Sequence, residues 1–253
     1  EYGGTFRHVI GGRPEGFNWL AGQSQGWGGI NIQLMESLTR LGPLWQIKPD
    51  EANPLPNLAK EWEWSSDRKS LTMNLIEGAR WSDGDIFDTE DIDFWWNDNV
   101  QDANVASRLP KDALGAGTTL EILGPYSFKF NFDEPKGNAV LAQLAYMGGA
   151  PGPSHVMKPL HPAHNSDATY ESYANGMPAS VLPIVTLGAY VPVVHKVDEL
   201  MVMKRNPYYW KVDEECNQLP YYNETIYKLT SWDDRTTQAL AGTGDFSHME
   251  HPG

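Results

Sequence analysis

Residues 56–92 read PNLAKEWEWSSDRKSLTMNLIEGARWSDGDIFDTEDI, and this stretch carries the densest structural signal in the chain. Apolar and polar residues alternate from Leu71 to Leu75, which predicts a strand with one buried face. Asp83-Gly84 is a pair that strongly favours a turn. Asp88 or Thr89 is then placed to cap a helix whose acidic first turn suits the helix dipole. The stretch therefore predicts a strand, a turn and a helix, in that order.

Outside this stretch, the same alternation recurs once, further along the chain. Residues 126–132 place four aromatic side chains on one side and three polar side chains on the other, which is typical of a strand. We also expect strands at residues 5–10, 199–204 and 225–229. These patterns predict a chain rich in β-structure.

Helical spacing of apolar residues occurs in two further places. Residues 30–41 should form a helix that Gly42-Pro43 ends, and residues 235–241 a short helix that Gly242 ends. Residues 148–183 contain six prolines and little periodicity, so we expect a loop there. The combination predicts an α/β or α+β fold.

Composition excludes several classes of function. The chain has 253 residues and a net charge of −14, which disfavours nucleic acid and anionic membranes as partners. No apolar run reaches the roughly 18 residues that predict a membrane span. We expect that any signal peptide lies outside the numbered sequence. The single cysteine, Cys216, excludes an internal disulfide.

Motifs for catalysis and metal binding are missing from the sequence. The acidic residues between 83 and 93 lack the spacing of a calcium loop, and a turn followed by a helix cap explains them. His155, His161 and His164 are separated by prolines, so we expect a solvated loop rather than a zinc site. The acidic neighbours of Cys216 disfavour a thiolate nucleophile. We therefore predict no catalytic residue, no metal and no cofactor.

Aromatic residues are the most unusual part of the composition, with ten tryptophans, eleven tyrosines and eight phenylalanines. Most of these rings should pack in the core, although aromatic rings also stack on sugars and wall mixed pockets. A carbohydrate-active enzyme or a carbohydrate-binding module therefore stays open as an alternative.

Several motifs together resemble one known family. The stretch at 56–92 matches the pattern "P-x-L-A-x-x-W", a strand, "W-x-D-G" and a helix that opens with an acidic pair. Residues 187–190 and 205–210 follow, and then residues 219–222 and 244–246, in the same order as in the family. From about residue 3 to 246 the chain resembles family 5 of the extracytoplasmic solute-binding proteins of ABC importers, which bind peptides or oligosaccharides.

The resemblance implies a periplasmic-binding-protein-like fold of type II, with two lobes around a hinge. Residues 1–44 and 184–253 would form the two parts of the first lobe. Residues 45–183 would form an inserted β-rich subdomain, and the second lobe would be absent because family members are longer. The chain departs from the family at residues 185–190, where a Gly-Thr-Gly-Pro-Tyr motif is usual, and at Cys216, where glycine is usual.

The same resemblance implies binding without catalysis. A monomeric protein in the periplasm or outside the cell, membrane-associated if it is a lipoprotein, would deliver a small-molecule ligand to an ABC permease. Arg13 or Glu15 would pair with a charged terminus of the ligand. Phe17, Trp19 and Trp27 would stack on a sugar or wall a side-chain pocket. Whether the ligand is a peptide, an oligosaccharide or something smaller stays open.

Overall fold

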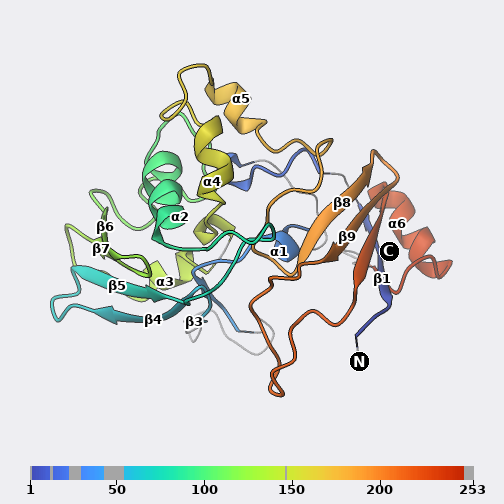
Figure 1. Cartoon of the computed structure of the whole chain (residues 1–253), viewed down its shortest axis with the longest axis horizontal. Coiled ribbons are helices and arrows are strands. Elements are labelled where there is room, and N and C mark those ends of the chain that lie inside the picture. The colour runs from blue at the N-terminus through green and yellow to red at the C-terminus, as the bar shows by residue number, and fades with distance from the viewer. Residues whose placement is uncertain (1, 12–13, 23–29, 43–53, 146, 248–253) are drawn as a thin grey trace.

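The computed structural model describes residues 2–11, 14–22, 30–42, 54–145 and 147–247. Two sheets lie at opposite sides of the molecule, with helix α1 (Ile30–Leu34) between them (Figure 1). One hydrophobic core cluster contains buried residues from both sheets. The sheets therefore belong to one packed body.

A five-stranded mixed sheet brings together both ends of the chain. Its strands, in spatial order, are β11 (Phe246–Ser247), β1 (Thr5–Gly11), β10 (Glu224–Thr230), β9 (Leu200–Arg205) and β8 (Tyr190–Lys196). Strand β1 runs parallel to both of its neighbours, while β10, β9 and β8 pair antiparallel. The strands expected at residues 5–10, 199–204 and 225–229 are confirmed.

A four-stranded antiparallel sheet comes from the middle of the chain. Its spatial order is β4 (Ala59–Trp64), β5 (Ser70–Leu75), β7 (Ser127–Asn131) and β6 (Thr119–Gly124). The predicted alternation is present, because Phe128 and Phe130 on β7 are fully buried and their neighbours are only half-buried. The π-helical segment η3 (Phe94–Val100) helps to cover this face, with the ring centroid of Trp96 4.9 Å from that of Phe130.

Shorter elements connect the two sheets. They are η1 (Trp19–Ala21), β2 (Thr39–Arg40), β3 (Leu55–Pro56), α3 (Ala139–Gln143), η4 (Met147–Gly149), α4 (Ser154–Met157), η5 (Lys158–Leu160) and α5 (Tyr170–Ala174). The expectation of a loop throughout residues 148–183 was therefore wrong, because short helices form between the prolines. Helix α6 (Trp232–Leu240) follows β10 and ends just before Gly242, close to where the sequence predicted.

The predicted helix cap at Asp88 is confirmed. Asp88 accepts a hydrogen bond from the Glu90 amide and forms a capping box with Asp91 at the start of α2 (Thr89–Asp93). Asp91 itself is buried and accepts hydrogen bonds from Trp81 Nε1 at 2.9 Å and from the Ser154 amide at 2.8 Å. Burial raises the pKa of Asp91 to about 6, although these hydrogen bonds oppose the shift. One carboxylate thus joins the turn at residue 81, helix α2 and helix α4.

Helix α1 is shorter than the sequence predicted, since it ends at Leu34 rather than near Leu41. The Gly188 amide donates to the Leu34 carbonyl at 3.1 Å, and residues 39–40 then pair with β3 as a strand. A side chain at Gly188 would clash with the Gln33 carbonyl, because its Cβ would lie 2.1 Å away. Leu38 lies beyond the end of the helix, yet it is buried in the core. The apolar pattern therefore predicted its burial correctly, although the helix does not extend to it.

The three histidines do not share one solvated loop. His161 is fully buried, with its ring centroid 4.5 Å from that of Tyr173, so the solvated prediction was wrong for this residue. His155 and His164 instead lie partly exposed, with Nε2 2.8 Å from Oδ2 of Asp83 and of Asp98 respectively. The acidic residues near the turn therefore hold a histidine in place.

The strands of the two sheets come from different parts of the chain. The five-stranded sheet uses residues 5–11 and 190–247, and the four-stranded sheet uses residues 59–131. The division into a first lobe at 1–44 and 184–253 and an insert at 45–183 stays a prediction, although the origin of the strands is compatible with it.

Candidate functional site

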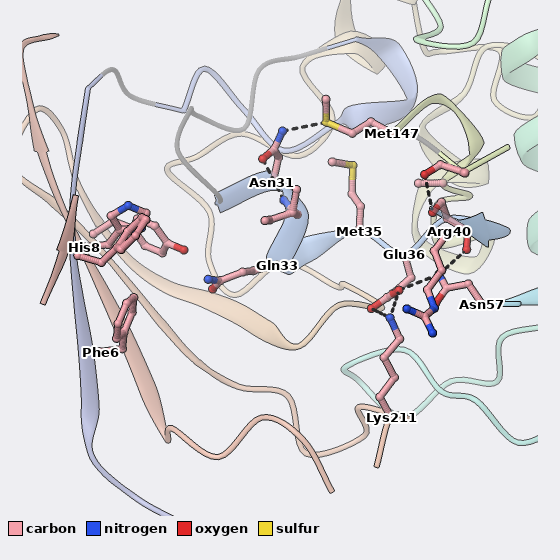
Figure 2. A pocket seen from close by; sticks show the side chains of 16 residues that line it. Phe6, His8, Asn31, Gln33, Met35, Glu36, Arg40, Asn57, Met147 and Lys211 are labelled. Atoms are coloured by element: carbon pink, nitrogen blue, oxygen red, sulfur yellow. Dashed lines mark hydrogen bonds and ion pairs between the residues drawn. The ribbon is translucent and has the colours of Figure 1, made fainter. Parts of the chain in front are cut away.

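A cavity of about 700 Å³ lies between the five-stranded sheet and helix α1 (Figure 2). Aromatic side chains from the sheet form one wall. Helix α1 and the residues that follow it form the opposite wall, and Ala145, Met147 and Ala150 close one side. Elements far apart in the sequence therefore build this cavity together.

The aromatic wall follows from the pairing of three strands. Phe6 and His8 are two residues apart on β1 and so lie on the same face of the sheet. The parallel register places His8 beside Tyr227 on β10 and beside Phe246 on β11. The ring centroid of His8 is 5.1 Å from that of Tyr227 and 4.8 Å from that of Phe246. Burial raises the pKa of the Tyr227 hydroxyl, which keeps this wall neutral there.

The opposite wall presents amides and thioethers. Asn31 and Gln33 belong to α1, and Figure 2 shows Gln33 pointing toward the strand that carries Phe6 and His8. Asn31 Nδ2 donates to the sulfur of Met147 at 2.8 Å. Flexible, polarizable methionine side chains adapt well to ligands of irregular shape.

The end of the cavity beside β2 is charged but internally paired. Glu36 accepts hydrogen bonds from Lys211 Nζ at 2.7 and 2.9 Å, from Tyr209 Oη at 2.6 Å and from Asn57 Nδ2 at 2.9 Å. Burial, followed by the Glu36 carboxylate, raises the pKa of Tyr209 and keeps its hydroxyl a donor. Arg40 is exposed at the same end and donates from Nε to the Pro56 carbonyl at 3.2 Å. The buried Glu36 and the half-buried Lys211 therefore neutralise each other at this end.

Asn57 adds one acceptor that the protein does not use. Its Nδ2 donates to Glu36 and to the Ser37 carbonyl, while its buried Oδ1 has no hydrogen-bond partner among the residues that the structure describes. A buried acceptor without a donor is costly, and such groups are often satisfied by water or by a ligand.

This arrangement suits reversible binding of a neutral ligand that has both an apolar face and hydroxyl groups. Within the described ranges, no group of three or more His, Cys, Asp or Glu side chains could hold a metal ion. No helix in the described part of the chain is long and apolar enough to span a bilayer. Cys216 is exposed, and it lies in the left-handed backbone region at φ 64°.

Among the residues that the structure describes, Glu15, Phe17 and Trp19 were nominated for ligand contact, and none of the three lines this cavity. Arg13 and Trp27 lie outside the described residues, and Glu15 is exposed to solvent. Phe17 and Trp19 are 0% and 2% exposed within the core, and Trp19 Nε1 donates to the Pro151 carbonyl. Both rings therefore pack against other protein groups in this chain, and their contact with a ligand stays a prediction.

Sequence reasoning missed the residues that do line the cavity. Alternation in residues 5–10 was a signal that Phe6 and His8 share a face, but it did not show whether that face is covered. Phe246 lies about 240 residues away, and only the pairing of β1 with β11 brings it to His8. The role of Lys211 likewise depends on a contact with Glu36 across 175 residues.

Comparisons with known proteins point to one family. The family model for bacterial extracellular solute-binding proteins, family 5 middle, matches residues 53–252. A periplasmic alpha-galactoside-binding protein of Rhizobium meliloti is 51% identical over 99% of this chain and 36% of its own length. The periplasmic oligopeptide-binding protein OppA of Salmonella typhimurium is 27% identical over 69% of this chain and 32% of its own length.

Solved structures show the same relationship. The periplasmic binding protein MelB of Agrobacterium fabrum C58, in complex with stachyose, matches with 50% identity and a TM-score of 0.92 over 97% of this chain and 37% of its own. An oligopeptide-binding protein OppA matches with 26% identity and a TM-score of 0.74. The chain thus spans about a third of the length of these relatives, and it forms part of the first lobe of a periplasmic-binding-protein fold, as the sequence predicted.

Proposed function

The chain belongs to family 5 of the bacterial extracellular solute-binding proteins, and from this premise we propose that it helps to capture an α-galactoside oligosaccharide for an ABC importer. The observation that carries this proposal is 51% identity, over nearly the whole chain, to a protein that binds alpha-galactosides. The more distant relatives that bind peptides, at 23% to 27% identity, favour that ligand class less.

The cavity supports a sugar rather than a peptide. A pyranose ring has an apolar face of C–H groups and an edge of hydroxyls, which suits aromatic rings opposite amide side chains. A peptide would bring two charged ends, whereas the buried Glu36 and the half-buried Lys211 already neutralise each other. The ligand would also contact the remainder of a longer protein, because relatives extend well beyond this chain.

We propose that the protein binds its ligand and catalyses no reaction. The relatives are binding proteins, and a closed, ligand-bound form is what a permease would recognise. The protein would act as a monomer in the periplasm, as the names of these relatives suggest for their own location. Arg13, Glu15, Phe17, Trp19 and Trp27 remain proposals for additional ligand contacts.

Isothermal titration calorimetry tests the ligand class. We expect stachyose to bind saturably, while maltotetraose, which has no galactose, and a tetrapeptide bind at least tenfold more weakly, a difference of about 1.4 kcal/mol. Tight binding of the peptide with no binding of stachyose would contradict the proposal.

Chromatography of the sugar after long incubation tests the absence of catalysis. We expect stachyose to be recovered intact at every protein concentration. Release of galactose that disappears on mutation of one carboxylate would support the carbohydrate-active enzyme instead.

A further inference from the structure

A row of aromatic rings continues from the cavity across the face of the five-stranded sheet. The ring centroid of Phe6 lies 6.5 Å from that of Phe246 and 5.6 Å from that of Tyr222. Tyr222 does not line the cavity, whereas Phe6 and Phe246 do. We name Tyr222, Phe6 and Phe246 the aromatic ladder. It leads from the cavity toward the start of β1.

Local geometry places Tyr222 on the same face as Phe6. Gly4 lies immediately before β1, two residues from Phe6. A Cβ at Gly4 would lie 3.7 Å from the Tyr222 ring, so this ring occupies the space above a residue that has no side chain. The backbone at Gly4 has a φ of 74°, which strongly favours glycine. The ladder is thus built into the start of the sheet.

Exposure separates the ladder from ordinary core packing. Tyr222 is 49% exposed and Phe246 is 50% exposed, while Tyr227 on the same face is fully buried. A contiguous exposed aromatic surface usually marks a site of interaction. Its ring faces can bind C–H groups, whose partial positive charge complements the negative face of the π-system.

Polar groups for hydroxyls lie close to the ladder. Gln33 on α1 is half-buried and faces the strand that carries Phe6 (Figure 2), and its Oε1 accepts from Thr225 Oγ1 at 3.4 Å. Thr225 is the register partner of Phe6 on β10. An amide group therefore lies beside the part of the ladder that lines the cavity.

We infer that Tyr222 extends the sugar site beyond the cavity, where its ring stacks on a further pyranose unit of an oligosaccharide whose end occupies the cavity. This inference rests on the proposed function and sharpens it, because it predicts selection for chain length. A long α-galactoside reaches Tyr222, and a disaccharide bound in the cavity does not.

The test compares the affinities of two sugars in one variant. Tyr222→Ala should weaken binding of the tetrasaccharide stachyose about tenfold and leave binding of the disaccharide melibiose unchanged. Phe246→Ala, which alters the cavity itself, should weaken both sugars. Tyr222→Phe keeps the ring and should retain the affinity of the wild type for stachyose.

A matched control lies next to Tyr222 in the sequence. Tyr221 is also exposed, but its ring contacts Tyr2 and its hydroxyl donates to Asp213. Tyr221→Ala should leave both affinities unchanged. An equal loss in Tyr221→Ala and Tyr222→Ala would overturn the inference, since it would indicate a general disturbance of this loop.

Two other outcomes would also overturn it. Unchanged affinity of Tyr222→Ala for stachyose, combined with a lower unfolding midpoint, would mean that another protein segment packs on the ladder. An equal loss of affinity for stachyose and melibiose in Tyr222→Ala would mean that Tyr222 does not distinguish sugars by their chain length. If the wild type binds no α-galactoside, the proposed function fails, and that result is distinguishable from both.

Discussion

The two sheets use aromatic residues in opposite ways. On β7, Phe128 and Phe130 alternate with polar residues and are fully buried beneath η3. On β1, Phe6 and His8 alternate in the same manner, yet they face a cavity, and Phe246 beside them is half exposed. The same sequence pattern therefore yields a packed core in one sheet and an open aromatic wall in the other.

The difference arises from what covers each face. In the four-stranded sheet, helix α2 continues directly into η3. Segment η3 places the ring of Trp96 against the ring of Phe130. In the five-stranded sheet, a cavity of about 700 Å³ separates part of the aromatic face from α1. The difference teaches that the half-exposed rings of this face, unlike those of β7, are accessible to a ligand.

Phe130→Ala should produce the largest effect of the substitutions considered. The variant should lose about 3–5 kcal/mol of the free energy of unfolding, because it removes a fully buried ring from a packed core. Urea unfolding followed by tryptophan fluorescence measures this loss. A loss near 1 kcal/mol would contradict the difference between the two sheets, since it would mean that the face of β7 is no better packed than that of β1.

Raising the pH should destabilise the protein through Asp91. The pKa of this carboxyl is raised by burial from 3.8 to about 6 in the folded state, so between these values the unfolded state loses its proton first. The free energy of unfolding should therefore decrease by up to about 3 kcal/mol as the pH rises through this window.

Urea unfolding at several pH values, in the wild type and in Asp91→Asn, isolates this contribution. The variant cannot ionise at position 91, so its stability should depend less steeply on pH between 3.8 and 6. Parallel pH profiles for the two proteins would show that Asp91 carries no such shift.

Glu36→Ala should cost about 2 kcal/mol of the free energy of unfolding. The change leaves the buried Tyr209 hydroxyl and the Lys211 ammonium without their shared acceptor, and the partial exposure of Lys211 limits the loss. Adding Lys211→Met should recover part of the stability, because it removes the unpaired charge. A double variant as unstable as the single one would show that the charge of Lys211 contributes little.

Phe246→Ala should have the smallest effect on stability, about 1 kcal/mol, because half of its surface is already exposed. It should nevertheless reduce sugar affinity more than any change in the four-stranded sheet that leaves the protein folded. Stability and calorimetry measured on the same samples decide this. A loss of stability similar to that of Phe130→Ala, with unchanged affinity, would place Phe246 in the core.

Local sequence signals predicted much of the fold. Alternation located the two central strands of the four-stranded sheet, the Asp-Gly pair located the turn at residue 83, and Asp88 was correctly identified as a helix cap. The order of motifs identified the family. These features depend on residues close in sequence, whose backbone preferences act before any tertiary contact forms.

The candidate site depended on contacts between distant residues. The alternation of apolar and polar residues predicts on which face of a strand a ring lies. Whether that face is covered depends on the elements that pack against it. For this reason Phe17 and Trp19 were nominated for ligand contact and are buried, while Phe6, Phe246 and Lys211 were overlooked and line the cavity. The end of α1 at Leu34 was likewise decided by Gly188, far along the chain.

The sequence by itself thus determined the strands, the turn, the cap and the family of this protein. The tertiary structure alone decided which aromatic rings remain open, where α1 ends and why Asp91 and His161 are buried. The physical reason is that burial, and with it ring exposure and the pKa of a carboxyl, is a property of the whole packed molecule. Periodicity along the chain determines only the direction in which a side chain points.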